Sequence, residues 1–374
     1  MKISCTFLLI LIISVPFFKV HSQTIRGSIL DKTSKETLSG ATIYLDGTTI
    51  SAITDGDGNF TLNTRGNNAT LVISFIGYAT FRLENPLQFV NKTLRVLLEK
   101  ESIDLDEVVI GKGPFTRKEM LEVFREQFLG TSRSGKSCKI LNEQDIILRY
   151  DLANNTLHAS ARNPLKIKNN YLGYEVSFDL TELVVQYVSK SLRKHDQIQS
   201  LFSGTTFYKD IAKNKNADKR RKETFYGSAT HLTHTIANNT WEKEKIRLFV
   251  GGLQTNPGIY FQISDSLDWK KVKLIKEPQA EVRKVKTEKN DKGQVVLIET
   301  EEYELKPTNL NVLYQKDKQS FIEFREKVFF VDKNGNYNPV FALGFGGYIG
   351  TLKAGDMLPI DYYETIKTSK KVQK

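Results

Sequence analysis

His231 and His234 are the residues best placed for metal or acid–base chemistry, because they stand three positions apart in the chain. On a helix this spacing puts both imidazoles on one side, where they can ligate zinc or copper. No acidic residue completes the pattern of a metalloprotease helix, and Cys138 is the only cysteine besides Cys5. Packing and ordinary hydrogen bonding are the alternative roles. We therefore assign no catalytic residue and no metal ligand, with His231 and His234 as the only candidates.

A phosphate-binding pattern, GxxxxGK[ST], is fulfilled by residues 130–137, which read GTSRSGKS. In nucleotide-binding proteins such a loop follows a buried strand and opens a helix whose N-terminus holds phosphate. Here it follows residues 116–129, whose apolar residues recur at helical spacing, and no convincing acidic partner for magnesium is present. We interpret residues 130–137 as a turn rich in glycine and serine rather than a nucleotide site, and we expect no cofactor.

Asp55, Asp57 and Asn59 place three oxygen-bearing side chains at alternate positions, as at the start of an EF-hand calcium loop. Such a loop needs a bidentate glutamate at its twelfth position, where this chain has Gly66. The same residues, with glycines between them, are typical of a tight turn. The pattern therefore favours a structural turn over a calcium site.

An export signal is predicted at residues 1–22. Lys2 precedes an apolar run from Phe7 to Phe18, and residues 20–22 suit signal peptidase, so the mature chain is expected to begin at Gln23. The run is too short to span about 30 Å of hydrocarbon as a helix, and no later segment approaches the roughly 20 apolar residues required. We expect an exported protein, periplasmic or associated with the outer membrane, without a transmembrane helix after signal removal.

The chain is basic, with a formal net charge of +11 at pH 7. Much of the excess lies in two blocks, Lys209 to Lys222 and Lys270 to Lys289. Such blocks are typical of solvated loops. The alternative is contact with an anionic surface through Lys209 to Lys222, either lipopolysaccharide head groups or acidic protein. Nucleic acid is an unsuitable partner, because an exported protein rarely meets it and the basic runs lack interleaved aromatic residues that stack on bases.

Short alternating strands fill residues 23–100. Strands are predicted at 24–30, 41–45, 51–54, 60–62, 71–75 and 94–98, with turn-forming residues between them. Six or seven short strands at such close spacing predict an antiparallel β-sandwich.

Four spaced motifs in this region carry a family resemblance. They are Gly40-Ala41, Asp46-Gly47-Thr48, Thr54-Asp55-x-Asp57-Gly58-Asn59-Phe60 and Phe75-Ile76-Gly77-Tyr78. In this order they resemble the carboxypeptidase regulatory-like domain, a transthyretin-like sandwich. In Bacteroidota this domain often fronts outer-membrane proteins, including TonB-dependent receptors of the polysaccharide-utilisation type. The resemblance implies a fold and a compartment, and no catalysis is known for the domain.

Residues 101–113 are interpreted as a linker strand. Leu105 to Gly113 resembles the segment that joins this domain to the plug of TonB-dependent receptors. There, an extended apolar strand can add itself to the edge of the energy-transducing protein. Residues 114–374 lack the many alternating segments of about ten residues that a receptor barrel needs. The segment is therefore a linker or, alternatively, a docking peptide for TonB.

Residues 114–374 predict a β-rich α+β domain. One helix is expected at 116–129, with Thr116 and Glu119 as a capping box and Gly130 as the C-cap, and a second at 228–237, capped by Ser228. The glycine-rich run 344–350 fails the dinucleotide-binding spacing and indicates a bulged strand or a sheet corner. Strands are expected at 146–150, 156–161, 171–180, 183–188, 205–211, 246–249, 295–303, 327–331 and 340–349.

No motif gives a reaction. The leading hypothesis is a non-enzymatic cell-envelope protein, in which the sandwich is a docking or spacer module and residues 114–374 bind an envelope protein or a glycan. The whole chain loosely resembles a group of Bacteroidota cell-envelope proteins. The alternatives are a hydrolase using His231, His234 and nearby acids, and a TonB-linked accessory protein acting through Asp106 to Gly113. A pocket that gathers the histidines with a carboxylate would favour the hydrolase, and a flat aromatic or basic face would favour binding.

Overall fold

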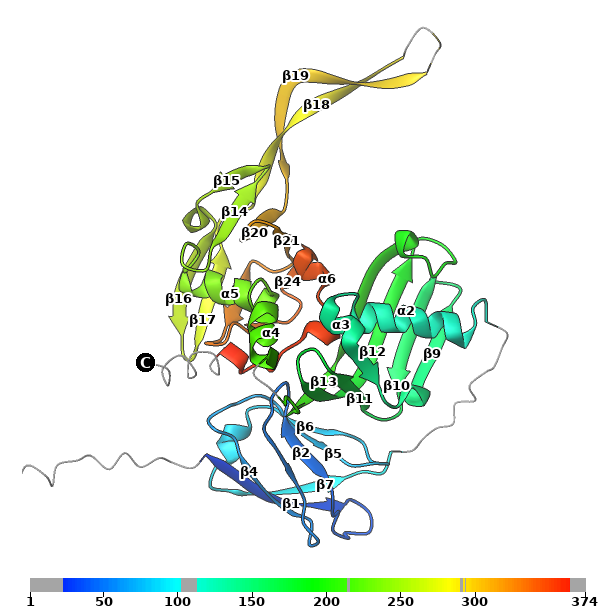
Figure 1. Ribbon diagram of the computed structural model, residues 1–374. Helices are drawn as coiled ribbons and strands as arrows, with labels where there is room; N and C mark the ends of the chain where they lie inside the picture. Colours follow the sequence, from blue (N-terminus) through cyan, green and yellow to red (C-terminus); the bar gives the residue numbers. More distant parts are fainter. Residues whose placement is uncertain (1–22, 102–112, 214–215, 290–291, 293, 364–374) are drawn as a thin grey trace, which may run out of the picture. The chain divides into compact units, whose positions relative to one another are not determined.

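The computed structural model describes residues 23–101, 113–213, 216–289, 292 and 294–363 (Figure 1). The chain divides into two compact units, one formed mainly by residues up to 104 and the other mainly by residues from 105 onward. The predicted export signal and most of the predicted TonB-docking segment, Leu105 to Lys112, lie outside the described residues. Among the helices that are described, none is long and apolar enough to cross a membrane.

The N-terminal unit is a β-sandwich, which confirms the predicted fold. Its elements are β1 (Thr24–Asp31), β2 (Thr42–Leu45), β3 (Ser51–Ile53), β4 (Asn59–Asn63), β5 (Leu71–Ser74), β6 (Phe81–Leu83), η1 (Pro86–Phe89) and β7 (Thr93–Leu98). One sheet has the strand order β4-β1-β7 and the other β3-β2-β5-β6. Neighbouring strands are antiparallel except β1 and β7, which are parallel. Ile25, Ile43 and Leu71 are fully buried in the core that both sheets share.

A sheet covered by a helix opens the C-terminal unit. Its elements are α2 (Arg117–Leu129), α3 (Arg133–Ser137), β8 (Cys138–Ile140), η2 (Glu143–Asp145), β9 (Ile146–Asp151), β10 (Thr156–Ala161), β11 (Leu165–Asn169), β12 (Tyr174–Tyr187), η3 (Lys194–Asp196) and β13 (Gln197–Asp210). The strand order is β8-β11-β12-β10-β9, and β13 pairs with β12. Phe124 and Phe128 lie one helical turn apart on α2 and are fully buried in the core of this sheet.

Two predicted strands in this sheet are wrong. The strand expected at 171–180, with Gly173 inside it, and the separate strand expected at 183–188 are one strand, β12. Gly173 has a φ of 69° and its N–H bonds to the carbonyl of Asn169 at 2.9 Å, so it closes the turn before β12. An irregularity between Leu180 and Glu182 keeps the later half of β12 paired with β13.

Two further sheets follow a pair of helices. Their elements are α4 (Asn216–Phe225), α5 (Ala229–Asn238), β14 (Ile246–Val250), β15 (Leu253–Thr255), η4 (Pro257–Ile259), β16 (Phe261–Ser266), β17 (Trp269–Leu274), β20 (Leu310–Tyr314), β21 (Lys318–Phe324), β22 (Val328–Val331), β23 (Tyr337–Asn338), β24 (Leu343–Gly347), α6 (Tyr348–Thr351) and η5 (Ala354–Asp356). The sheets have the orders β15-β14-β20-β21-β24 and β16-β17-β22-β23. Leu232 and Ile236 of α5 pack in the core between them.

The strand predicted at 340–349 is also wrong in extent. Only residues 343–347 form a strand, and the chain then turns into the short helix α6. The ring of Phe321 covers Gly346, so a Cβ there would displace the ring, and Gly347 has a φ of 66°. The glycines therefore serve close packing and a sharp turn.

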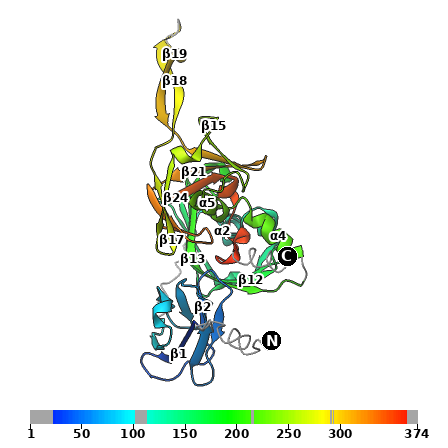
Figure 2. The same ribbon diagram turned by 90° about the vertical axis from the view of Figure 1, so that its left-hand side faces the viewer.

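Strands β18 (Gln279–Lys289) and β19 (Val295–Pro307) form a two-stranded sheet of their own, which we call the arm. Figures 1 and 2 both show the arm as a narrow, twisted ribbon that extends away from the rest of the C-terminal unit. The basic block predicted as a loop at Lys270 to Lys289 thus consists largely of strands β17 and β18.

Candidate functional site

The C-terminal unit contains a groove of about 620 Å³, which we call the apolar groove. Strand β13, the loop before β24, helix α6 and residues 352–363 line it. Four apolar side chains along it are exposed, namely Leu201 at 44%, Val340 at 66%, Phe341 at 62% and Met357 at 38%. A concave, mostly apolar surface with exposed anchors of this kind is typical of a binding site.

Strand β13 gives the apolar groove the edge of a sheet. Along Gln199 to Phe202, which line the groove, β12 is the only strand paired with β13 in the described part of the chain. An edge strand presents backbone N–H and C=O groups that an added strand can pair with. Ser200 Oγ is buried there without a hydrogen-bond partner among the described residues. The groove therefore offers polar backbone and apolar side chains together.

Three charged residues lie along the groove, Asp356, Lys353 and Arg325. Ser132 Oγ donates to Asp356 Oδ1 at 2.7 Å, and burial raises the pKa of Asp356. Burial lowers the pKa of Lys353. Asp356 is the only carboxylate among the described lining residues, which include neither histidine nor cysteine. The described lining therefore holds no nucleophile paired with a histidine base.

Helix α5 places both candidate histidines outside this lining. His231 is 1% exposed, and its Nδ1 accepts the N–H of Gly227 at 3.1 Å while Nε2 lies 3.1 Å from Glu244 Oε2. Burial lowers the pKa of His231, so the ring is neutral and Nε2 donates to Glu244. His234 is buried, with its ring centre 4.1 Å from that of Tyr363. Among the described residues, no group of three or more His, Cys, Asp or Glu side chains can hold a metal ion.

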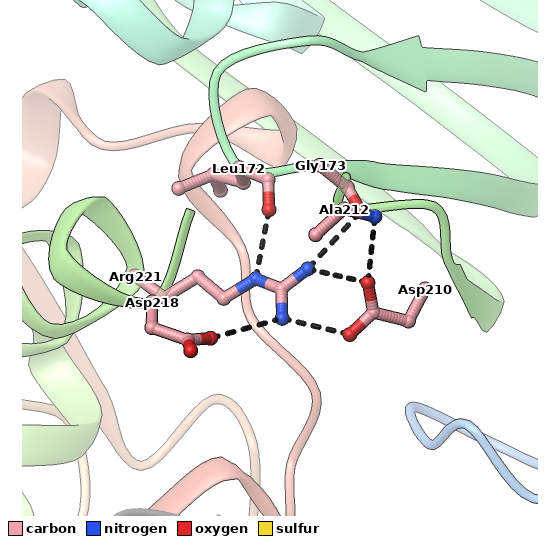
Figure 3. A network of polar contacts seen from close by, with 6 residues as sticks. All are labelled: Leu172, Gly173, Asp210, Ala212, Asp218 and Arg221. Atoms are coloured by element: carbon pink, nitrogen blue, oxygen red, sulfur yellow. Dashed lines mark hydrogen bonds and ion pairs between the residues drawn. The ribbon is translucent and has the colours of Figure 1, made fainter. Parts of the chain in front are cut away.

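The basic block from Lys209 to Lys222 is not the solvated loop that was expected. It ends in helix α4, and Arg221 is 5% exposed. Figure 3 shows its guanidinium bound to Asp210 through two nitrogens and to the carbonyls of Leu172 and Gly173. A spacing of four residues brings Ala217, Arg221 and Phe225 onto the buried face of α4, and this spacing was the missed signal.

Fewer cations of this block are available to an anionic surface than its sequence indicates. Arg220 lies over the ring of Tyr171, 4.9 Å from its centre, and donates to the Tyr171 carbonyl at 3.2 Å. Lys219 lies 4.0 Å from Glu223, one helical turn away. Arg220 and Arg221 therefore anchor α4, whereas Lys209, Lys213 and Lys219 are exposed cations.

Residues 130–137 form the end of α2 and the short helix α3, not a loop after a strand. Ser132 Oγ caps α3 by accepting the N–H of Gly135 at 2.9 Å, and Ser134 Oγ donates to the carbonyl of Gly355. Gly135 is buried against the backbone of Gly355. The segment therefore packs two chain stretches together and lacks the strand-to-helix geometry of a phosphate loop.

A second depression, of about 1310 Å³, has a mixed lining whose polar residues include Lys245, Arg247 and Asn256. Trp241 also lines it but is 6% exposed, with its ring stacked 6.0 Å from that of Phe261. The depression therefore offers no open tryptophan face for stacking on a sugar.

The family motifs of the N-terminal unit stabilise its turns. Asp55 Oδ1 accepts the N–H groups of Asp57 and Asn59 at 3.0 and 2.8 Å, which is the structural turn favoured over calcium. Tyr78, which ends the last motif, donates its hydroxyl to Asp31 Oδ2 at 2.7 Å. These motif residues thus hold turns and a tertiary contact of the sandwich in place.

The comparisons with known proteins concern mainly this N-terminal unit. Residues 25–110 match the family model of the CarboxypepD_reg-like domain. The TonB-dependent receptor SusC of Bacteroides thetaiotaomicron is 37% identical over 98 residues, which are 26% of this chain and 9% of the receptor. The chain thus spans only a small part of this relative.

Two solved structures are also similar in part, both of mutant type II Cohesin-X-Dockerin complexes from Acetivibrio cellulolyticus. The C-terminal interface mutant matches with 27% identity over 20% of this chain and 51% of that chain, with a TM-score of 0.16. The N-terminal interface mutant matches with 27% identity over 29% of this chain and 75% of that chain, with a TM-score of 0.19. Scores this low carry no inference about fold or partner, whereas the sandwich, its motifs and the family match agree. Residues 25–110 of this chain are a CarboxypepD_reg-like domain.

Proposed function

We propose that this protein is a non-enzymatic docking protein of the bacterial cell envelope, in the periplasm or at the outer membrane. The CarboxypepD_reg-like domain is the spacer or docking module, and the C-terminal unit binds an extended segment of another envelope protein. The similarity of the N-terminal unit to a TonB-dependent receptor supports the compartment. The apolar groove supports the binding role.

The apolar groove combines the open edge of a sheet with exposed apolar side chains, and this combination is the main support for the proposal. Gln199 to Phe202 of β13 can pair with an extended chain through backbone groups. Leu201, Val340 and Phe341 can receive its apolar side chains. A glycan offers neither an extended backbone nor apolar side chains, so a protein segment is the better partner for this groove.

The binding role is preferred to the hydrolase alternative because of where the histidines lie. Both ring nitrogens of His231 already have partners, Gly227 and Glu244. Among the described residues, neither His231 nor His234 lines the apolar groove, and Asp356 is the only carboxylate in its lining. A hydrolase needs an acid, base or nucleophile within reach of a bound substrate.

Site-specific photo-cross-linking in the native cells tests the proposal. A photoreactive residue at Phe341 should give one dominant adduct with an envelope protein, and Val340→Ser in the same chain should abolish it. The matched control is the same photoreactive residue at Leu267, a fully exposed apolar position outside the groove. Equal adducts from both positions, or none from Phe341, would contradict groove binding.

TonB docking is a second candidate, because the family match continues to residue 110 and so includes most of the predicted docking segment. Deletion of Asp106 to Gly113 should abolish recovery of TonB in a pull-down if this role is correct. The Val340→Ser variant should leave TonB recovery unchanged, which separates the two functions.

A further inference from the structure

Lys353 brings an uncompensated positive charge to the wall of the apolar groove. Its side chain is half-buried, and its ammonium group makes no hydrogen bond or ion pair with the described residues. Burial lowers the pKa of Lys353, and no carboxylate acts against this shift. Removing an ammonium group from water without an opposite charge beside it is costly. A ligand that brings an anion to Lys353 therefore gains affinity.

The other two charged residues of the lining already have partners. Arg325 Nη2 lies 3.7 Å from Glu323 Oε2. Asp356 Oδ1 accepts the hydroxyl of Ser132 at 2.7 Å, and its Oδ2 accepts the backbone N–H of Lys353 at 3.4 Å. Burial raises the pKa of Asp356, which favours its neutral form. Among the described lining residues, Lys353 is thus the charged side chain left for a ligand.

The edge of β13 determines which backbone groups a bound segment can reach. The N–H of Ile211, directly after β13, bonds to the carbonyl of Gly173, directly before β12. Alternate residues of a strand direct their backbone groups to the same neighbour. The irregularity near the middle of the pair adds its extra residue to β12, so this alternation continues along β13. Ser200 and Phe202 therefore direct their N–H and C=O groups away from β12, towards the open edge.

We infer that the segment bound in the apolar groove is acidic, with an aspartate or glutamate carboxylate placed against Lys353. The inference rests on the proposed function and specifies the chemistry of the bound segment. Its backbone pairs with Ser200 and Phe202, and its apolar side chains contact Val340 and Phe341. A basic segment would bring a second cation to Lys353, and like charges repel. A neutral segment would cover the ammonium group without compensating its charge.

Selection of displayed random nonapeptides on the immobilised full-length protein tests the inference. Peptides selected on the wild type should combine apolar residues with an aspartate or glutamate. Lys353→Met should still select apolar peptides, but without enrichment of acidic residues. Selection on Val340→Ser should fall to background, because an apolar contact of the groove is lost. Lys316→Met, which removes an exposed cation outside the groove, should select the same peptides as the wild type.

The outcomes separate this inference from the proposed function. Peptides that require Val340 but carry no acidic residue would overturn the inference and leave groove binding intact. Acidic peptides that Lys353→Met selects equally well would also overturn it, because their carboxylate then binds elsewhere. If no selected peptide depends on Val340, groove binding itself is contradicted.

Fluorescence anisotropy with one selected peptide measures the interaction between its carboxylate and Lys353. Replacing the acidic residue of the peptide by its amide should weaken binding to the wild type by at least about tenfold, because a hydrogen bond between charged groups is lost. The same replacement should change binding to Lys353→Met little, because the ammonium group is already absent. Equal losses with both proteins would overturn the inference.

The stability of the free protein gives a readout that does not depend on any peptide. Lys353→Met keeps an unbranched side chain and removes the uncompensated charge, so the urea midpoint of the free protein should rise. An ammonium group with a structural partner would give the opposite change. A lower midpoint for Lys353→Met would therefore show that the charge is already compensated, and the inference would fail.

Discussion

Arg221 binds both carboxylate oxygens of Asp210, with Nη1 2.8 Å from Oδ2 and Nη2 2.9 Å from Oδ1. The guanidinium carbon also lies 3.8 Å from the centre of the Tyr174 ring. Nε and Nη2 reach the carbonyls of Leu172 and Gly173 at 2.7 and 3.0 Å. One side chain of α4 thus ties together the turn before β12 and the end of β13, which no lysine can do with a single ammonium group.

Replacing Arg221 by lysine should destabilise the C-terminal unit by roughly 2 kcal/mol, because Asp210 and two carbonyls lose their planar donor. The half-exposed Asp210 can regain water, which limits the loss. Urea unfolding monitored by tryptophan fluorescence measures the change, since both tryptophans, Trp241 and Trp269, lie in this unit. Lys219→Ala, at a solvent-exposed position on the same helix, should change the midpoint little. Equal effects of the two substitutions would contradict the anchoring role.

Asp31 should make the N-terminal unit sensitive to acid. The hydroxyl of Tyr78 and the N–H groups of Ser34 and Thr33 hold the pKa of Asp31 at about 2. An unfolded chain has an aspartate pKa of about 3.9, so this contribution to stability is present above that value and is lost as the pH falls towards 2. Urea midpoints of the wild type should therefore drop between pH 4 and pH 2.

The Asp31→Asn variant should be less stable than the wild type at pH 7. On acidification its free energy of unfolding should fall less than that of the wild type, because it has no carboxylate to protonate at this position. Asp57→Asn, in an exposed turn of the same unit, is the matched control and should follow the wild-type curve. If the urea midpoints of wild type and Asp31→Asn fall in parallel with pH, the Tyr78–Asp31 hydrogen bond does not cause the loss of stability in acid.

Patterns whose determinants lie close together in the chain could be predicted from the sequence. Thr116 and Glu119 form the expected capping box at the start of α2, and Gly130 ends the helix. Both caps depend on residues within a few positions of each other. Helix α5 likewise begins after Ser228, as predicted, and the strands of the N-terminal sandwich follow the alternation of apolar residues within each segment.

Features that depend on distant residues could not be predicted. Arg221 looks like part of a solvated charge block until Asp210 and the β11–β12 turn fold around it. The many charged residues of β18 hide the pattern by which a strand is predicted from sequence. Only its pairing with β19 in the structure identifies it as a strand. The apolar groove joins Leu201 to Val340 and Phe341, from segments far apart in the chain, so no sequence window contains it.

Protonation of His231 should make the folded protein less stable in mild acid. Burial lowers the pKa of His231 below the ordinary value of about 6.5. The imidazole therefore binds a proton more readily in the unfolded chain than in the folded protein. The folded state of the wild type therefore loses stability as the pH falls below about 6.5. His231→Phe should cost roughly 1 to 3 kcal/mol at pH 7, because the N–H of Gly227 and the carboxylate of Glu244 lose their partner.

Between pH 7 and pH 5, the His231→Phe variant should lose less stability than the wild type. Zinc at equimolar concentration should leave the melting temperature of the wild type unchanged, because no third ligand group accompanies the two histidines among the described residues. A zinc-dependent rise in melting temperature that His231→Phe removes would instead support the metal or hydrolase alternative.

Gly135 should be required for packing and not for nucleotide binding. A Cβ at this position would meet the carbonyl oxygens of Leu129 and Gly130, so Gly135→Ala should destabilise the C-terminal unit by roughly 1 to 3 kcal/mol. Lys136 is exposed, and Lys136→Met should leave stability unchanged. Magnesium ATP should shift the melting temperature of neither the wild type nor Lys136→Met, because binding to the folded state alone would raise it. A shift seen with the wild type and lost in Lys136→Met would restore the phosphate-loop interpretation of residues 130–137.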